Sequence, residues 1–400
     1  NALRVQYKDR GELTRSNVYE IMDSNAPESE RKEVWQLFLA EIEKSAPRLN
    51  EIMDEMILLR NEVATTVGLP NYAVHGLHVI EYSVGLDKIK EALQAIKTTM
   101  RPLITRAVAL QAKRLGKEVT ELQPWDMANK TRLALPEEVE PLQPLKDKVQ
   151  SADETAEDGV PAGKEILDVA QALFARIHPE LAAAYSAIIA ANHADILRRP
   201  TKSSGIAAAC FHRHSDMDAA GLPPFLFLNH NPDADQIASV VRVLMHESGH
   251  GVQGQRLIEQ HQTPGEHRLS ETRTELAEIT SITVEELTTA HFDVLLAEEG
   301  DQKRAYMELR QRTIYEMAFS GALIDFEIWM YEHAGHDAKT RKEKYAAIMK
   351  EYGFHPEHWS EDMTGNDWQV VPHLFTNPSY FATYLLARIV AMQFGYQYKE

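Results

Sequence analysis

Amphipathic helical periodicity is the feature of this 400-residue sequence that most constrains its fold. Apolar residues recur three and four positions apart in many segments, which is the pattern of a helix with one buried face. These segments are 28–45, 86–116, 164–177, 180–198, 271–299, 301–333, 339–352 and 379–397, and a separate helix is expected to begin at Pro47 and stop near Gly68. Strand patterns are few, at 205–212 and 223–230. The sequence therefore predicts a mainly α protein with a small β-sheet.

The balance of charged residues restricts the classes of partner that such a helical protein would bind. The chain has 42 Lys and Arg against 60 Asp and Glu, a net charge of −18. Because nucleic-acid binding requires a basic face, this balance disfavours nucleic acid as a partner. No apolar stretch approaches the ~20 residues that a membrane helix needs, and no signal peptide is recognisable. We expect a cytoplasmic protein with no membrane partner, and no particular oligomeric state is favoured.

Composition also divides the chain into three parts. Residues 151–163, SADETAEDGVPAG, are acidic and poor in large apolar residues, which indicates an exposed loop or linker. We expect residues 1–150 to form an N-terminal helical part of one functional unit. Residues 164–400 would form its second part, which carries the candidate site.

A single cysteine, Cys210, excludes an intramolecular disulfide and any metal site made of cysteines alone. A metal would therefore be bound by histidines and carboxylates. His246 and His250, in the run HESGH, are four residues apart, so on a helix both imidazoles project from one face. This is the geometry of two zinc ligands, and Glu247 lies where a carboxylate can take a proton from a metal-bound water.

The alternative is an exposed helix face with two solvated histidines. The apolar run DADQIASVVRVLM before the motif favours a buried helix instead. Gly249 supports the same interpretation, because a glycine inside a helix costs stability and usually has a packing reason. Cys210 is expected to be a buried small residue.

A zinc site that performs chemistry needs a third protein ligand. Three glutamates downstream, Glu271, Glu275 and Glu278, lie on roughly one face of the helix expected over 271–299. Periodicity does not choose among them, and each one alone could equally be an exposed charge.

Several segments resemble the thimet oligopeptidase and oligopeptidase F family of zinc peptidases, gluzincins with an HExxH motif and a downstream Glu. They occur in the family's order: PTKSSGIAAACFHRHSDMDAAGLPPFLFLNHNPD, HESGH, LAEITSITVEEL and VVPHLFTNPSYFATYLLARIVA. The resemblance implies a large helical zinc-peptidase domain with a small sheet lining the active-site cleft. It also implies one Zn²⁺ per chain, with Glu278 as third ligand. Glu275 would then orient a ligand histidine, and it is the alternative third ligand because it fits the family's usual spacing better.

The resemblance further implies a mechanism in which a zinc-bound water attacks the peptide carbonyl with Glu247 as general base. Tyr384 is the candidate donor to the developing oxyanion, with Tyr380 and His373 as further candidates. Each tyrosine could instead be a core residue with a satisfied hydroxyl, and His373 could be a structural helix cap. His212 and His214 are expected to be loop histidines or to lie just outside the ligand sphere.

We therefore expect a metallopeptidase that hydrolyses oligopeptides, acting as an endopeptidase. An angiotensin-converting-enzyme-like dipeptidase, a Taq-type carboxypeptidase and a non-catalytic helical binding protein are the alternatives. The segment PPFLFLN could be a sheet-edge strand that binds a peptide backbone by β-addition, or an ordinary buried strand.

Overall fold

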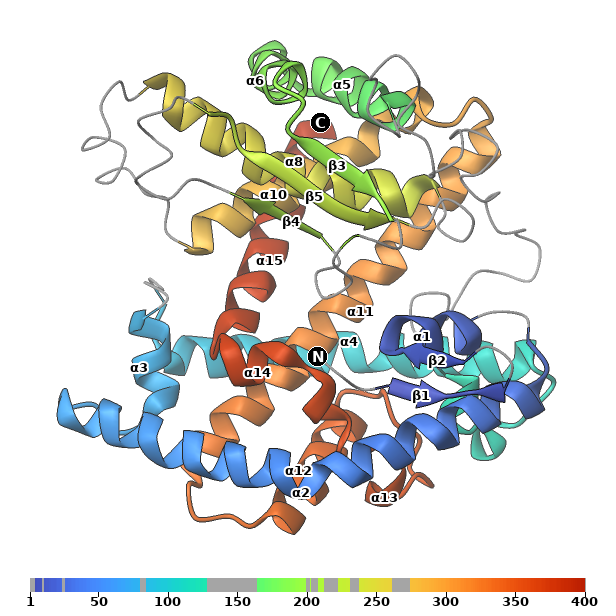
Figure 1. The fold of residues 1–400 in the computed structure, drawn as a ribbon, viewed down its shortest axis with the longest axis vertical. Helices are drawn as coiled ribbons and strands as arrows, with labels where there is room; N and C mark the ends of the chain where they lie inside the picture. The colour runs from blue at the N-terminus through green and yellow to red at the C-terminus, as the bar shows by residue number, and fades with distance from the viewer. Residues whose placement is uncertain are drawn as a thin grey trace. The chain divides into compact units, whose positions relative to one another are not determined.

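The computed structural model describes residues 4–8, 11–23, 26–79, 84–127, 164–198, 202, 208–211, 222–230, 237–260 and 274–399. Helices dominate these residues, which confirms the predicted fold class (Figure 1). The chain forms two compact units. Unit 1 comprises Asn1–Glu138 and Glu308–Leu385, and unit 2 comprises Val139–Met307 and Leu386–Glu400.

Unit 1 is built almost wholly from helices. Its elements are β1 (Arg4–Gln6), β2 (Glu12–Thr14), α1 (Arg15–Asp23), α2 (Glu28–Thr66), α3 (Tyr72–Val79), α4 (Leu86–Arg114), α12 (Ala338–Glu351), α13 (Glu361–Thr364) and α14 (Pro372–Thr376), with short 3₁₀ turns at Val119–Glu121, Pro124–Asp126 and Asp367–Val370. The long helices α11 (Glu299–Glu332) and α15 (Tyr380–Lys399) contribute residues to both units. β1 and β2 pair antiparallel.

The helix break expected at Pro47 does not occur. α2 runs without interruption from Glu28 to Thr66, with Pro47 inside it. Proline removes one backbone hydrogen bond and destabilises a helix interior. The buried face nevertheless continues on both sides, through Ile42 and Ala46 before the proline and Met53 after it. Packing of this face outweighs the local preference of proline.

Unit 2 contains a three-stranded sheet in the order β3 (Ala194–Leu197), β5 (Phe225–His230), β4 (Ala208–Phe211). β3 is parallel to β5, and β4 is antiparallel to it. β5 is thus the central strand, so the reading of PPFLFLN as a sheet edge is wrong and the buried-strand reading is right. Leu226 and Leu228 on β5 are fully buried, and α8 (Ile237–Gln260) packs on β4 and β5.

Two predicted helices of unit 2 end earlier than expected. α6 (Pro179–Ala190) stops within the predicted helix 180–198, because Asn192 adopts a left-handed backbone conformation, with φ of 56°. The chain then enters β3. α10 (Thr274–Thr288) gives way to a 3₁₀ turn over Thr289–Val294, where His291 has non-helical backbone angles. α5 (Lys164–Ile177) matches its prediction.

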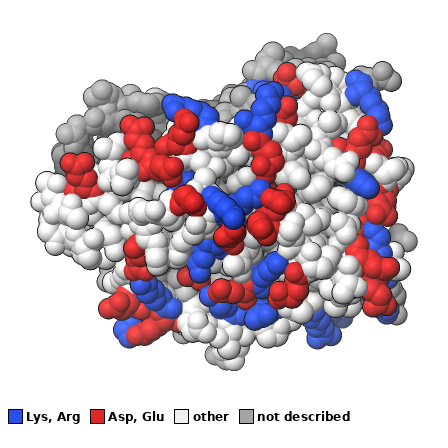
Figure 2. Space-filling view, turned by 90° about the horizontal axis from the view of Figure 1, so that it is seen from below, with Lys and Arg blue, Asp and Glu red and all other residues white. Residues whose placement is uncertain are grey.

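In the described part of the chain, no helix is long and apolar enough to cross a membrane. The face drawn in Figure 2 carries basic and acidic side chains interspersed rather than in patches of one sign. Exposed ion pairs such as Arg48–Glu51, with 3.0 Å between nitrogen and oxygen, accompany this mixture. Pairs of this kind contribute at most about 1 kcal/mol each.

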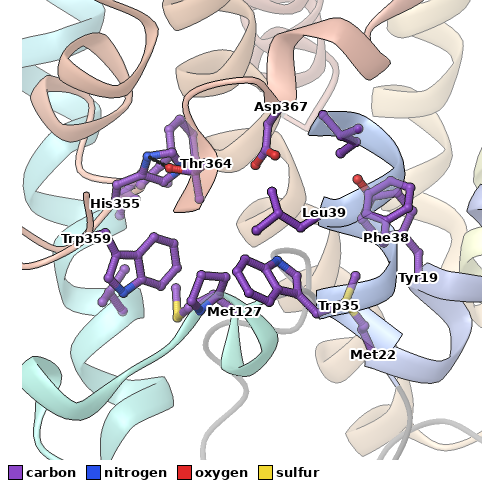
Figure 3. Close-up of a pocket in the computed structure, with 15 residues that line it drawn as sticks. Tyr19, Met22, Trp35, Phe38, Leu39, Met127, His355, Trp359, Thr364 and Asp367 are labelled. Atoms are coloured by element: carbon purple, nitrogen blue, oxygen red, sulfur yellow. Dashed lines mark hydrogen bonds between the residues drawn. The ribbon is translucent and has the colours of Figure 1, made fainter. Parts of the chain in front are cut away.

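Unit 1 also contains an aromatic cavity with a volume of about 50 Å³ (Figure 3). Trp35 and Phe38 from α2 line one part of its wall, and Trp359 and His355 lie on the opposite side. None of the residues predicted for the candidate site is among its lining residues. The cavity therefore belongs to the core of unit 1 and takes no part in the site described next.

Candidate metal centre

The helix that carries the HESGH motif is buried as the sequence predicted. Val240, Val241, Leu244 and Met245, just before the motif, are almost completely shielded from solvent. α8 packs on one side against the sheet and on another against α10. This burial holds the motif residues against α10 and excludes the interpretation of an exposed helix face.

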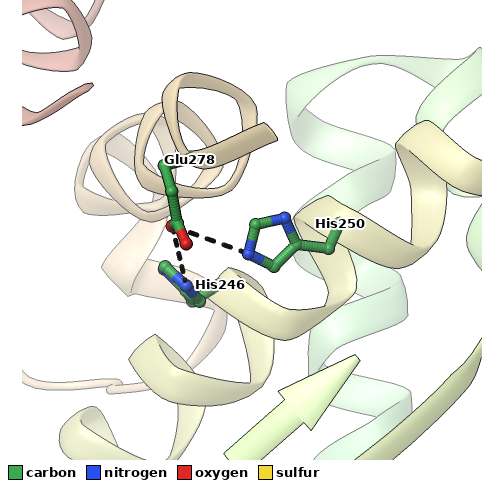
Figure 4. A group of neighbouring side chains, drawn as sticks. All are labelled: His246, His250 and Glu278. Atoms are coloured by element: carbon green, nitrogen blue, oxygen red, sulfur yellow. Dashed lines mark ion pairs between the residues drawn. The ribbon is translucent and has the colours of Figure 1, made fainter. Parts of the chain in front are cut away.

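Two histidines from α8 and one glutamate from α10 converge at this seam (Figure 4). The Nε2 atom of His246 lies 3.5 Å from Oε2 of Glu278, and Nε2 of His250 lies 3.6 Å from the same oxygen. One ligand atom from each residue falls within 4.8 Å of the other two. The structure thus brings together the three residues that the sequence predicted as ligands.

This donor set fits zinc. Zinc binds imidazole nitrogen and carboxylate oxygen at about 2.0–2.2 Å in tetrahedral sites, so its ligand atoms lie about 3.4 Å from one another. The two separations at Glu278 agree with that value. Three protein ligands leave a fourth position for water, as zinc sites that perform chemistry require.

Close contact between the two helices depends on small residues. A Cβ atom on Gly249 would lie 2.8 Å from the backbone Cα of Ser281 on α10, so only glycine allows this approach. Ser281 is fully buried, and its hydroxyl donates to Oε2 of Glu278 over 3.1 Å. Gly249 therefore has the packing role that the sequence indicated, and Ser281 fixes the carboxylate of Glu278.

A further glutamate orients His246. Oε1 of Glu285 on α10 lies 2.6 Å from Nδ1 of His246, which leaves Nε2 facing Glu278. Arg242 and Arg388 donate to the other oxygen of Glu285 over 3.0 and 3.1 Å. The two guanidinium groups hold the pKa of Glu285 well below its usual range, although its burial acts in the opposite direction.

The charge of Glu285 also acts on the histidine. Burial is the largest single effect and would lower the pKa of His246, but the hydrogen bond that its ring donates to Glu285 and the negative charges of nearby glutamates together raise the pKa to about 9. Sequence reasoning gave the orienting role to Glu275, whose side chain lies outside the described residues. Glu285 follows Glu278 by seven residues, two helical turns along the same face, and this spacing was the signal that could have identified it.

Glu247 lies beside these candidate ligands in a buried position, with 7% of its surface exposed. Burial raises the pKa of its carboxyl to about 7, with smaller and opposing effects from His246 and from a hydrogen bond donated by the backbone N–H of Cys210. This hydrogen bond ties Glu247 to strand β4, so the small sheet adjoins the site. Cys210 itself is only partly buried, against the expectation.

The three predicted oxyanion donors lie in unit 1 and form one cluster of rings. The ring centroids of Tyr380 and Tyr384 are 5.1 Å apart, and that of His373 lies 5.6 Å from Tyr380 and 6.2 Å from Tyr384. All three are partly exposed. His373 does not cap α14, whose N-cap residue is Val371.

Several predicted residues lie outside the described part of the chain. These are the segment 151–163, Glu271, His212 and His214.

Comparison with known proteins identifies the family of this chain. The family model of peptidase family M3 matches residues 21–400. The chain belongs to this family. No curated protein matches the chain significantly.

Solved structures share the fold. PZ peptidase A with an inhibitor superposes with a TM-score of 0.74 at 19% identity, over 99% of this chain and 63% of its own. A candidate oligoendopeptidase F from Bacillus anthracis strain Ames gives 0.70 at 19% identity, over 100% of this chain and 62% of its own. For oligoendopeptidase F from Enterococcus faecium the values are 0.59 and 14%, over 99% and 57%. The chain spans less than two thirds of the length of each of these proteins.

Proposed function

We propose that this M3 family member is a zinc-dependent endopeptidase that hydrolyses peptide bonds in oligopeptides. The convergence of His246, His250 and Glu278 on one point between α8 and α10 is the observation that carries the proposal. Family membership and the fold shared with PZ peptidase A support it. One zinc ion per chain would be held by these three residues.

Zinc bound there would act as a Lewis acid and make water a nucleophile near neutral pH. In the proposed reaction Glu247 accepts a proton from the attacking water and delivers it to the leaving amine. Its carboxylate is held by the backbone N–H of Cys210 and shielded from bulk water. Glu285 and its two arginines keep His246 in the tautomer that presents Nε2 to the metal.

The oxyanion that develops on the substrate carbonyl needs a hydrogen-bond donor. We assign this role to Tyr384, with Tyr380 and His373 as further candidates in the same ring cluster. The partial exposure of the three rings supports the assignment, because a core residue would be buried.

The test is Glu247→Gln, which keeps the size of the side chain but removes the base. We expect the variant to retain stoichiometric zinc and to lose about 10²–10⁴-fold in kcat on an internally quenched peptide. Glu259→Gln is the control, since Glu259 lies on the same helix, is exposed and pairs with Arg256. A wild-type protein without zinc, or a Glu247→Gln protein with full turnover, would refute the proposal. Cleavage of a peptide blocked at both ends distinguishes endopeptidase from exopeptidase action.

A further inference from the structure

The turn between α14 and α15 has an unusual backbone. Ser379, its last residue, is buried and has a φ of 67°, in the left-handed region that residues with a Cβ seldom adopt. α14 before the turn carries His373, and α15 after it begins at Tyr380. The conformation of Ser379 therefore sets how the members of the ring cluster lie relative to one another.

Glu327 on α11 holds this serine. The backbone N–H of Ser379 donates to Oε1 of Glu327 over 2.7 Å, and only 4% of Glu327 is exposed. The surrounding side chains are mostly aliphatic: Ala73, Leu77, Ile89, Ile324 and Ile328 line the same small cavity. A carboxyl in such surroundings costs stability, and an aliphatic side chain would pack there without that cost. The presence of a glutamate therefore indicates a role other than packing.

Helix α3 closes over the other side of the serine. A Cβ atom on Gly76 would lie 2.3 Å from Oγ of Ser379, so the absence of a side chain at Gly76 leaves the space that the serine occupies.

Arg60 on α2 holds the start of the same turn. Its guanidinium donates to the carbonyl oxygens of Leu374 and Phe375, over 3.4 and 2.5 Å, at the end of α14. It also donates to the hydroxyl of Tyr331 over 2.8 Å. These carbonyls have no partner within so short a helix, so the guanidinium supplies the missing donors.

We propose that Glu327 and Arg60 are positioning residues, which clamp the two ends of the α14–α15 turn and so fix the ring cluster of His373, Tyr380 and Tyr384 for the reaction. The inference rests on the proposed function, since it concerns the geometry of the oxyanion donors. Neither residue takes part in the chemistry itself.

The test compares two replacements of Glu327 with similar volume. Glu327→Gln keeps an oxygen that accepts the Ser379 N–H, whereas Glu327→Met does not. We expect Glu327→Met to fold and to bind zinc like the wild type, but to lose about ten- to a hundredfold in kcat with little change in KM. Glu327→Gln should keep most of kcat. Glu332→Gln is the control, because Glu332 lies on the same helix and pairs with Lys90 at the surface.

A double-mutant cycle separates positioning from general stability. Glu327→Met is combined with whichever of Tyr384→Phe and Tyr380→Phe lowers kcat. If Glu327 acts through that ring, Glu327→Met has little further effect in its absence. Additive losses, equal activity of the Met and Gln variants, or full activity of both Phe variants would overturn the inference. Failure of the proposed function itself would appear separately, in the zinc content and in Glu247→Gln.

Discussion

Glu285 and Glu327 are equally buried, each with 4% of its surface exposed, yet their surroundings have opposite effects. In unit 2, Glu285 receives hydrogen bonds from Arg242 and Arg388, and its pKa lies well below the usual range. In unit 1, Glu327 accepts one backbone hydrogen bond among mostly aliphatic side chains, and burial raises its pKa to about 7, although the charge of Arg60 acts in the opposite direction.

This difference in pKa shows whether each site requires a negative charge or only a hydrogen-bond acceptor. At the candidate metal centre the charge itself is needed, because an ionised carboxylate fixes the tautomer of His246 and would strengthen it as a metal ligand. At the α14–α15 turn an acceptor suffices, because the partner of Glu327 is a neutral N–H group. Burial alone therefore does not reveal the role of an acid, whereas the number of cations that donate hydrogen bonds to it does.

Replacing each of the two glutamates by glutamine should have very different effects on stability and zinc affinity. Glu285→Gln leaves two arginines, each with only 10% of its side chain exposed, without their anion, so we expect a loss of about 3–5 kcal/mol in the free energy of unfolding. We also expect zinc affinity to fall about 10–100-fold. Urea unfolding and competition with a chelator measure the two effects. Glu327→Gln is the matched control, which should bind zinc like the wild type. Equal losses of stability and zinc affinity in both variants would show that the two carboxylates do not differ in role.

The second prediction concerns pH. The pKa of Glu327 rises from its ordinary value of 4.5 to about 7 on folding, so the folded protein holds a proton that the unfolded chain releases between these values. Wild-type stability should therefore fall, relative to Glu327→Gln, as pH rises from 4.5 to 7, and level off above. A shift of this size corresponds to about 3 kcal/mol.

Free energies of unfolding at pH 5 and pH 8, compared between the two proteins, measure this difference. At Glu285 the sign is reversed, because a lowered pKa gives stability that is lost as pH falls. A stability difference between wild type and Glu327→Gln that does not change with pH would show that Glu327 titrates normally.

Sequence periodicity predicted most of the long helices, because each has a buried face that repeats along the chain. It failed where packing or one residue's backbone decided the structure. Pro47 continues a helix through the packing of Ile42 and Met53, and Asn192 ends one in a left-handed turn. The short elements α1 and α3 were not predicted at all.

The geometry of the candidate metal centre was predictable from the sequence to the extent that it is local. The spacing of His246 and His250 identifies them as candidate ligands, and the motif around Glu278 identifies that residue. The contacts of Arg388 with Glu285 and of Ser379 with Glu327 join residues 103 and 52 positions apart. Such contacts depend on how distant helices pack, which no local pattern encodes. Both carboxylates outside the predicted site were found only from the structure.

The prediction with the smallest expected effect compares two glycines, one in each unit. A methyl group at Gly249 would meet the Ser281 backbone at 2.8 Å, and one at Gly76 would meet the Ser379 hydroxyl at 2.3 Å. A backbone must shift as a whole, whereas a hydroxyl can rotate away. Gly249→Ala should thus cost about 1–3 kcal/mol from overpacking, less the ~1 kcal/mol that alanine gains in a helix. Gly76→Ala should be nearly neutral, because the same helical gain offsets a smaller strain. Thermal unfolding ranks the two variants, and an equal loss in both would mean that the Ser379 side chain is held as rigidly as the seam between α8 and α10.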